Sequence, residues 1–192
     1  DPAKPVPYTE DVHLGRTREY MTDDQRFAAR RPDVLVFKTD ILPEDITLGG
    51  VLKADLLVSL STTDADFVVK LIDVFPDDFA YTQPLKAHYP MSAYQMLVRG
   101  EVFRGKFRNS FEKPEPFVPN KPAQVKYTLP DVAHTFKKGH RMMIQVQSSW
   151  FPLVDRNPQT FTDIYHAKLS DFQKADIRIY HNASKIILPI IK

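Results

Sequence analysis

The fold class is indicated by Gly139-His140-Arg141-Met142-Met143-Ile144-Gln145-Val146-Gln147-Ser148-Ser149-Trp150-Phe151-Pro152. Met142, Ile144 and Val146 are apolar at every second position, and Gln145 and Gln147 face the other way, which is typical of a half-buried β-strand. The strand leads into an aromatic, proline-bounded loop that continues through Asp155-Arg156-Asn157-Pro158. Loops at strand ends often carry the binding groups of a rigid scaffold. This loop offers no nucleophile with an obvious base, so we expect it to contact a partner or a substrate rather than to perform chemistry.

Similar β-type runs recur along the chain, at 34–37, 51–60, 67–75, 95–103, 124–129, 142–146, 176–180 and 186–191. Gly49-Gly50 is expected to form the turn into the second run, and a short helix is expected near 23–29. No segment between the runs sustains a 3.6-residue periodicity, so the pattern predicts an all-β protein without the crossover helices of a parallel sheet. Long connections at 76–94 and 104–123 favour a jelly-roll β-sandwich over a simple meander.

The composition is that of an ordinary globular domain, with 192 residues, 43% hydrophobic and 26% charged. The formal net charge is only +2, so we expect no nucleic-acid partner and no acidic membrane surface. The chain has no cysteine, which excludes disulfides, thiolate metal sites and a cysteine nucleophile. The Pro-rich opening, residues 1–7, resembles a connection within a longer chain. We therefore divide the sequence into a linker and lead-in segment, 1–30, and a β-sandwich domain, 31–192.

Motifs for catalysis and for cofactors are weak. No Gly-x-Ser-x-Gly element is present, and the near P-loop match Gly100-Glu101-Val102-Phe103-Arg104-Gly105-Lys106-Phe107 has phenylalanine where Mg²⁺ binding needs a hydroxyl. We interpret that run as a bend between strand segments. We expect neither a cofactor nor a bound metal.

Two groups of polar side chains have simpler structural interpretations than metal binding. His134 and His140 are six residues apart with no Cys or Glu to complete a zinc site, so we expect His140 to make a structural hydrogen bond. Asp66 and Lys70 share one face of their strand and predict an ion pair, whereas Asp73 should face the opposite side. The minor alternative is a calcium site among the aspartates at 64, 66, 73, 77 and 78.

The aromatic side chains Trp150, Phe151 and Tyr165 leave two interpretations open. They could stand on the rim of the sandwich and stack on a sugar or on an apolar partner, or the single tryptophan could fill the core.

The chain also resembles a known family over nearly its whole length, with the matching segments in the same order. They include Arg31-Pro32-Asp33-Val34-Leu35, Asp66-Phe67-Val68-Val69-Lys70-Leu71-Ile72-Asp73-Val74, Gly139-His140-Arg141, Phe151-Pro152 and Arg156-Asn157-Pro158. The family is the X-Pro dipeptidyl-peptidase, cocaine esterase and α-amino acid ester hydrolase group, which includes enzymes named glutaryl-7-aminocephalosporanic acid acylases. One departure is Gln159-Thr160-Phe161, where Asn-Thr-Gly is expected.

The resemblance implies a C-terminal, non-catalytic jelly roll of the galactose-binding type. Its partner would be an α/β-hydrolase catalytic domain of the same polypeptide, a serine hydrolase acting on small peptide, ester or amide substrates. By analogy, the loop 149–157 faces that domain, with Arg156 and Asn157 as docking groups and Trp150 or Phe151 lining the substrate cleft. A bacterial periplasmic or secreted location is expected over a cytoplasmic one, and a homo-oligomer is compatible with the sequence.

Two other functions fit the same fold, because architecture does not decide function. One is an independent carbohydrate-binding module, which would display two or three exposed aromatic rings on one face. The other is a structural cap that covers the hydrolase domain without touching substrate.

Overall fold

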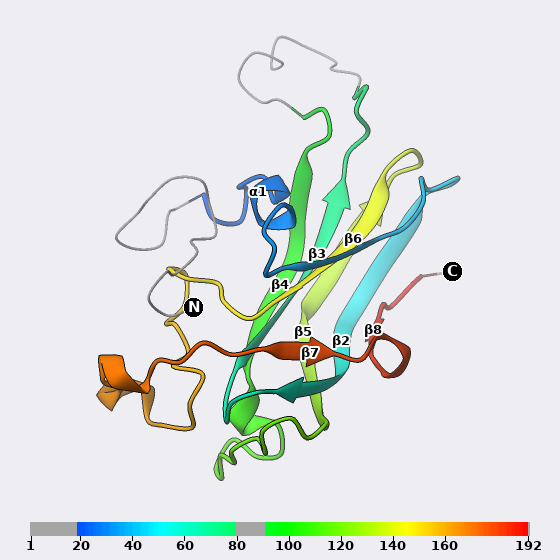
Figure 1. The fold of residues 1–192 in the computed structure, drawn as a ribbon. Helices are drawn as coiled ribbons and strands as arrows, with labels where there is room; N and C mark the ends of the chain where they lie inside the picture. The colour runs from blue at the N-terminus through cyan, green and yellow to red at the C-terminus, as the bar shows by residue number, and fades with distance from the viewer. Residues whose placement is uncertain (1–18, 80–90, 192) are drawn as a thin grey trace.

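The computed structural model describes residues 19–79 and 91–191, which form two antiparallel β-sheets packed face to face (Figure 1). The strands are β1 Leu35–Lys38, β2 Ile46–Leu60, β3 Asp66–Val74, β4 Gln95–Arg104, β5 Ala123–Phe136, β6 Arg141–Gln147, β7 Ile177–Ile179 and β8 Lys185–Ile187. One sheet has the order β1-β6-β3-β4, and the other has the order β5-β2-β7, with β8 also paired to β2. The predicted all-β sandwich is confirmed.

Helical structure in the described residues is limited to one short helix and four 3-10 turns. They are α1 Arg26–Ala29, η2 Gly105–Phe107, η3 Ile164–His166, η4 Leu169–Asp171 and η5 His181–Ala183. The helix lies within the expected range 23–29. None of the helical segments described is long and apolar enough to cross a membrane.

The two longest strands extend beyond their predicted limits. Gly49-Gly50 does not form a turn but lies within β2, where Gly50 has a φ of 126° and pairs with Val132 of β5. A Cβ on Gly49 would lie 2.5 Å from the side chain of Ile191, so this glycine allows the C-terminal segment to approach the strand. β5 likewise continues past Pro130, beside a register shift between Val51 and Lys53. Bulges tolerate proline because the hydrogen-bond ladder is already interrupted there.

The main core lies between the sheets and follows the predicted alternation. On β3, Phe67, Val69 and Leu71 point into it, and on β5 the apolar positions 125, 127 and 129 do the same. Burial of this apolar surface is the main force that holds the sheets together.

A second apolar layer covers the outer face of the β1-β6-β3-β4 sheet. Val68 and Ile72 of β3 pack there with Leu97, Met143 and Trp150. Nearly all of β3 is therefore buried on both faces, including the face that carries Asp66 and Lys70. The cover consists of the loop after β6 and of the lead-in residues 20 and 21. The domain boundary at residue 30 stays a prediction, but the described part of the lead-in packs on the sandwich.

Candidate functional site

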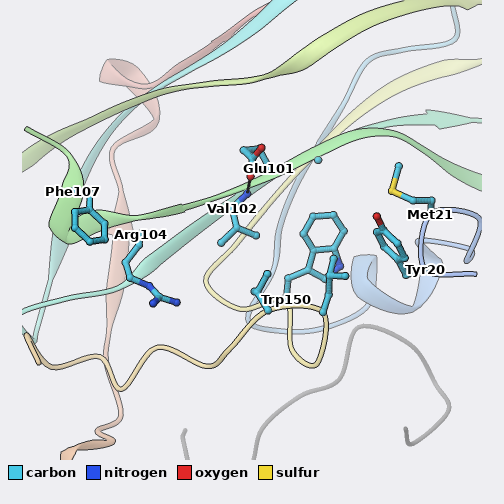
Figure 2. Close-up of a pocket in the computed structure, with 10 residues that line it drawn as sticks. Tyr20, Met21, Glu101, Val102, Arg104, Phe107 and Trp150 are labelled. Atoms are coloured by element: carbon cyan, nitrogen blue, oxygen red, sulfur yellow. Dashed lines mark hydrogen bonds between the residues drawn. The ribbon is translucent and has the colours of Figure 1, made fainter. Parts of the chain in front are cut away.

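A pocket of about 430 Å³ opens on the outer face of β4, between the lead-in segment and the loop after β6 (Figure 2). Figure 2 shows Tyr20, Met21 and Trp150 toward one end and Arg104 with Phe107 toward the other. The remaining lining residues are Gly100, Glu101, Val102, Leu153 and Val154. This described lining contains no Ser, Thr, Cys or His, so the pocket can bind a group but offers no nucleophile–base pair.

Trp150 forms the floor at one end of the pocket. Its side chain is only 4% exposed and belongs to the outer apolar layer, and the ring of Tyr20 meets it edge-on at 6.5 Å between centroids. Gly100 makes this packing possible, because a Cβ there would lie 2.7 Å from the indole. Of the two interpretations of this tryptophan, the structure supports packing: the side chain fills the outer apolar layer, and only a small part of it is accessible from the pocket.

Lys70 lies behind the tryptophan and is fully buried. Its ammonium lies 4.5 Å from the centroid of the Trp150 ring and donates a hydrogen bond of 2.9 Å to Oε1 of Gln25. Burial, and to a lesser extent the charge of Arg31, lower the pKa of Lys70 to about 7. The predicted ion pair between Asp66 and Lys70 is wrong, because Asp66 pairs with Arg104 instead.

Gln25 fixes the lead-in segment to the sheet. Its backbone N–H donates to the carbonyl of Gln95 at 3.0 Å, and its own carbonyl accepts from Nε2 of Gln145 at 3.2 Å. Gln145 faces away from the main core, as the alternation predicts, but it is buried because the lead-in lies over it. One wall of the pocket therefore depends on contacts between segments far apart in the sequence.

Asn157 anchors the other end of the loop. Its Nδ2 donates to Oδ1 of Asp66 at 2.8 Å and to Oδ2 of Asp64 at 3.2 Å, while its Oδ1 accepts from the backbone N–H of Gln159 at 2.8 Å. Asp66 in turn receives two hydrogen bonds, of 3.0 and 3.3 Å, from the guanidinium of Arg104 in the pocket. Asn157 is buried, so its amide positions the loop from inside the domain.

Asp64 is the most perturbed carboxyl group in this network. Burial raises its pKa to about 6, the charge of Asp66 adds to the rise, and the hydrogen bond from Asn157 opposes it. Its Oδ1 also accepts from the backbone N–H groups of Ala65 at 2.9 Å and Lys106 at 3.0 Å. The network thus contains a carboxyl group that titrates near neutral pH.

Phe151 and Arg156 form the half-buried part of the loop. The Arg156 guanidinium lies 5.3 Å from the Phe151 ring and 5.2 Å from the Phe172 ring. The peptide bond between Phe151 and Pro152 is cis. Of the four predicted site residues, only Trp150 lines the pocket; the other three shape the loop beside it.

Sequence reasoning missed most of the pocket. Gly100, Val102 and Arg104 occupy every second position of β4 and therefore share one face of the strand. This spacing within the near P-loop run could have indicated a common surface. Tyr20 and Met21 gave no such signal, because their approach to β4 depends on tertiary contacts.

The two histidines that were considered for metal binding meet a single carboxylate between the sheets. Nε2 of His134 lies 2.9 Å from Oδ2 of Asp73, and Nδ1 of His140 lies 2.8 Å from Oδ1 of the same residue. The structural hydrogen bond predicted for His140 is confirmed, and Asp73 faces away from Lys70 as expected. Across the described ranges, no group of three or more His, Asp or Glu side chains is arranged to hold a metal ion.

Comparison with known proteins extends these observations. Residues 7–185 match the model of the X-Pro dipeptidyl-peptidase C-terminal non-catalytic domain. The whole chain is 34% identical to a cocaine esterase from Rhodococcus sp. (strain MB1 Bresler), of which it covers 31%. The whole chain also superposes on an α-amino acid ester hydrolase (TM-score 0.89, 43% identity, 31% of that chain covered). An aminopeptidase from a marine sediment Thaumarchaeota archaeon gives a TM-score of 0.90 at 42% identity, with 32% of it covered.

The chain thus spans about a third of the length of these relatives, and the match covers both the core strands and the loop that anchors the pocket. The chain belongs to the family of X-Pro dipeptidyl-peptidase C-terminal non-catalytic domains.

Proposed function

We propose that the chain is the C-terminal domain of a serine hydrolase that cleaves small peptide, ester or amide substrates. In this proposal it packs on an α/β-hydrolase domain of the same polypeptide and helps to shape the substrate cleft. The observation that carries the proposal is the family match, combined with the fact that the chain covers only 31–32% of relatives named as an esterase, an ester hydrolase and an aminopeptidase.

The loop 149–157 and the adjoining pocket supply the docking surface. Trp150 fixes the start of the loop in the outer apolar layer, and Asn157 fixes its end to two buried carboxylates. Between these anchors the loop carries Phe151 and Arg156. A preorganised loop contributes to an interface at a low entropic cost, because it does not have to be ordered on contact.

The first test is the mass and composition of the native polypeptide. A species far larger than 22.1 kDa that contains a Gly-x-Ser-x-Gly segment supports the proposal. A native species near 22.1 kDa that binds glycans would contradict it and favour a carbohydrate-binding module.

The second test uses Arg156→Ala and Asn157→Ala in the longer polypeptide. If the loop docks and shapes the cleft, Arg156→Ala should change activity or substrate preference, and Asn157→Ala should also loosen the loop. Tyr165→Ala is the matched control, because this ring is 84% exposed and lies outside the pocket lining. If activity and stability remain unchanged in both loop variants, the loop has no docking role.

A further inference from the structure

The two edges of the sandwich differ in how they are closed. At one edge β4 and β5 lie close together: the rings of Phe103 and Tyr127 stack at 4.9 Å, and Nε of Arg99 donates to the carbonyl of Asp131 at 2.6 Å. At the opposite edge two adjoining pockets separate β1 and β6 from β7 and the chain that follows it. We call this second edge the open seam.

The open seam reaches the main core. Its larger pocket, about 400 Å³, is lined by Phe37, Ile144 and Ile179 and has Leu56 on its floor. The smaller pocket, about 160 Å³, reaches Phe67. Leu56 and Phe67 are otherwise core residues with at most 2% exposure, so the seam is a gap in the packing of the sandwich. The contact of Phe37 with the ring of His181, 5.2 Å between centroids, bridges the gap near the surface.

β1 presents an exposed apolar edge beside the seam. Within the described structure its strand partner is β6 alone, which leaves its other backbone edge unpaired. Leu35, Val36 and Phe37 are 38%, 36% and 42% exposed. An apolar edge strand of this kind promotes association unless another surface covers it, and contiguous exposed apolar patches usually mark interfaces.

We propose that the open seam and β1 are covered by the catalytic part of the same polypeptide, as a second contact beside the loop 149–157. This inference rests on the proposed function. About two thirds of each relative's chain lies outside the region that this chain matches. In a polypeptide of that length, each molecule carries its own surface that could cover the seam. The seam is also continuous with the docking loop, because Gln147 and Ser148, which lead into that loop, line its smaller pocket.

A second copy of this chain fits the seam less well than the catalytic part. β1 has only four residues, and a two-stranded pairing of such short strands is marginal in water. Most of the apolar surface at the seam lines the two pockets rather than β1 itself. A protruding side chain can fill such pockets, whereas the flat edge of a second β1 strand cannot. The covering segment is expected to insert apolar side chains beneath Phe37 and to pair with the free edge of β1.

The test uses the longer native polypeptide and its Phe37→Glu variant, with Phe111→Glu as the control. Phe111 is the same residue type, is 78% exposed, lies in the connection 104–123 and lines neither pocket of the seam. Amide hydrogen exchange is measured by mass spectrometry in all three proteins. We expect Phe37→Glu to accelerate exchange at least tenfold in residues 35–38 and in one segment of the catalytic part, while β3 stays protected. Phe111→Glu should change neither region.

Lysine cross-linking provides an independent measurement, because Lys38 ends β1 and Lys185 lines the seam. A short amine-reactive reagent should join one of them to the catalytic part within a monomer. Cross-links found only between copies, in a species that light scattering shows to be a dimer, would assign the seam to a second copy.

The exchange experiment also has an outcome that contradicts the proposal. If Phe37→Glu accelerates exchange throughout the sandwich, Phe37 stabilises the core of this domain and not a contact with the catalytic part. If the native polypeptide has no catalytic part, the proposed function itself fails; if it has one and β1 exchanges freely, only this inference fails.

Discussion

Asp64 allows the energetics of the loop anchor to be measured through pH. Its pKa rises from the ordinary value of 3.8 to about 6 in the folded protein, mainly because the side chain is buried. A folded-state pKa about two pH units above that of the unfolded chain corresponds to about 3 kcal/mol. Because the folded protein binds this proton more tightly, the stabilisation is fully present below about pH 4 and is lost as the pH rises through about 6.

The perturbation is Asp64→Asn, which keeps an oxygen to accept from the backbone N–H groups of Ala65 and Lys106 but cannot ionise. Urea unfolding, followed by the fluorescence of Trp150, gives the free energy of unfolding of both proteins between pH 4.5 and 7.5. The wild type should lose about 2 kcal/mol relative to the variant as the pH rises across this range, since part of the full ~3 kcal/mol is already lost between pH 4 and 4.5.

Asp45→Asn provides a control that should run parallel to the wild type between pH 4.5 and 7.5. The hydrogen bond from Lys137, followed by the backbone N–H of Lys138, lowers the pKa of Asp45 from its ordinary value of 3.8, so its contribution is fully present in this range and is lost only at lower pH. If the difference between the wild type and Asp64→Asn is the same at pH 4.5 and pH 7.5, the buried carboxyl is not the titrating group and the reasoning fails.

Three further substitutions test the packing around the pocket and its loop. Gly100→Ala should destabilise the domain by about 1–3 kcal/mol and shift the Trp150 emission to longer wavelength, since the new methyl group would lie 2.7 Å from the indole; unchanged emission and stability would contradict the packing. Burial lowers the pKa of Lys70 to about 7, so between pH 7 and 10 this lysine is mostly neutral in the folded protein and charged in the unfolded chain. The free energy of unfolding of the wild type should therefore rise with pH over this range, and Lys70→Met should abolish the rise. Parallel pH profiles for the two proteins would refute this. Gln159→Asn should stabilise by about 0.5–1 kcal/mol in thermal unfolding, because φ is 65° at this position and asparagine tolerates the left-handed region better than glutamine; a lower melting temperature would show that the glutamine side chain makes a compensating contact.

The departure at residue 159 shows how a resemblance and a structure inform each other. The resemblance led us to expect asparagine where this chain has glutamine, and the left-handed backbone at this position is one that asparagine adopts more readily. The Oε1 atom of Gln159 is buried without a hydrogen-bond partner among the described residues, which agrees with a residue that fits this position imperfectly.

The amino-acid sequence by itself determined the strands whose pattern is local. The alternation at 124–129 and 142–146, and the opposite faces of Asp73 and Lys70, follow from the two-residue period of a strand and hold in the structure. The family also followed from short motifs in a fixed order, because each of them reflects a local conformation or contact.

The tertiary structure alone decided what covers the strands. The outer face of β3 reads as half polar, but a lead-in residue, Gln25, takes the hydrogen bond of Lys70 and allows that face to be buried. Asp66 pairs with Arg104 across the sheet rather than with Lys70 along its own strand. The open seam likewise cannot be predicted from the sequence of any one strand, since it depends on the distance between the edges of two sheets. Contacts of this kind join residues far apart in the chain, and their energies depend on the relative positions of whole elements, which no local pattern encodes.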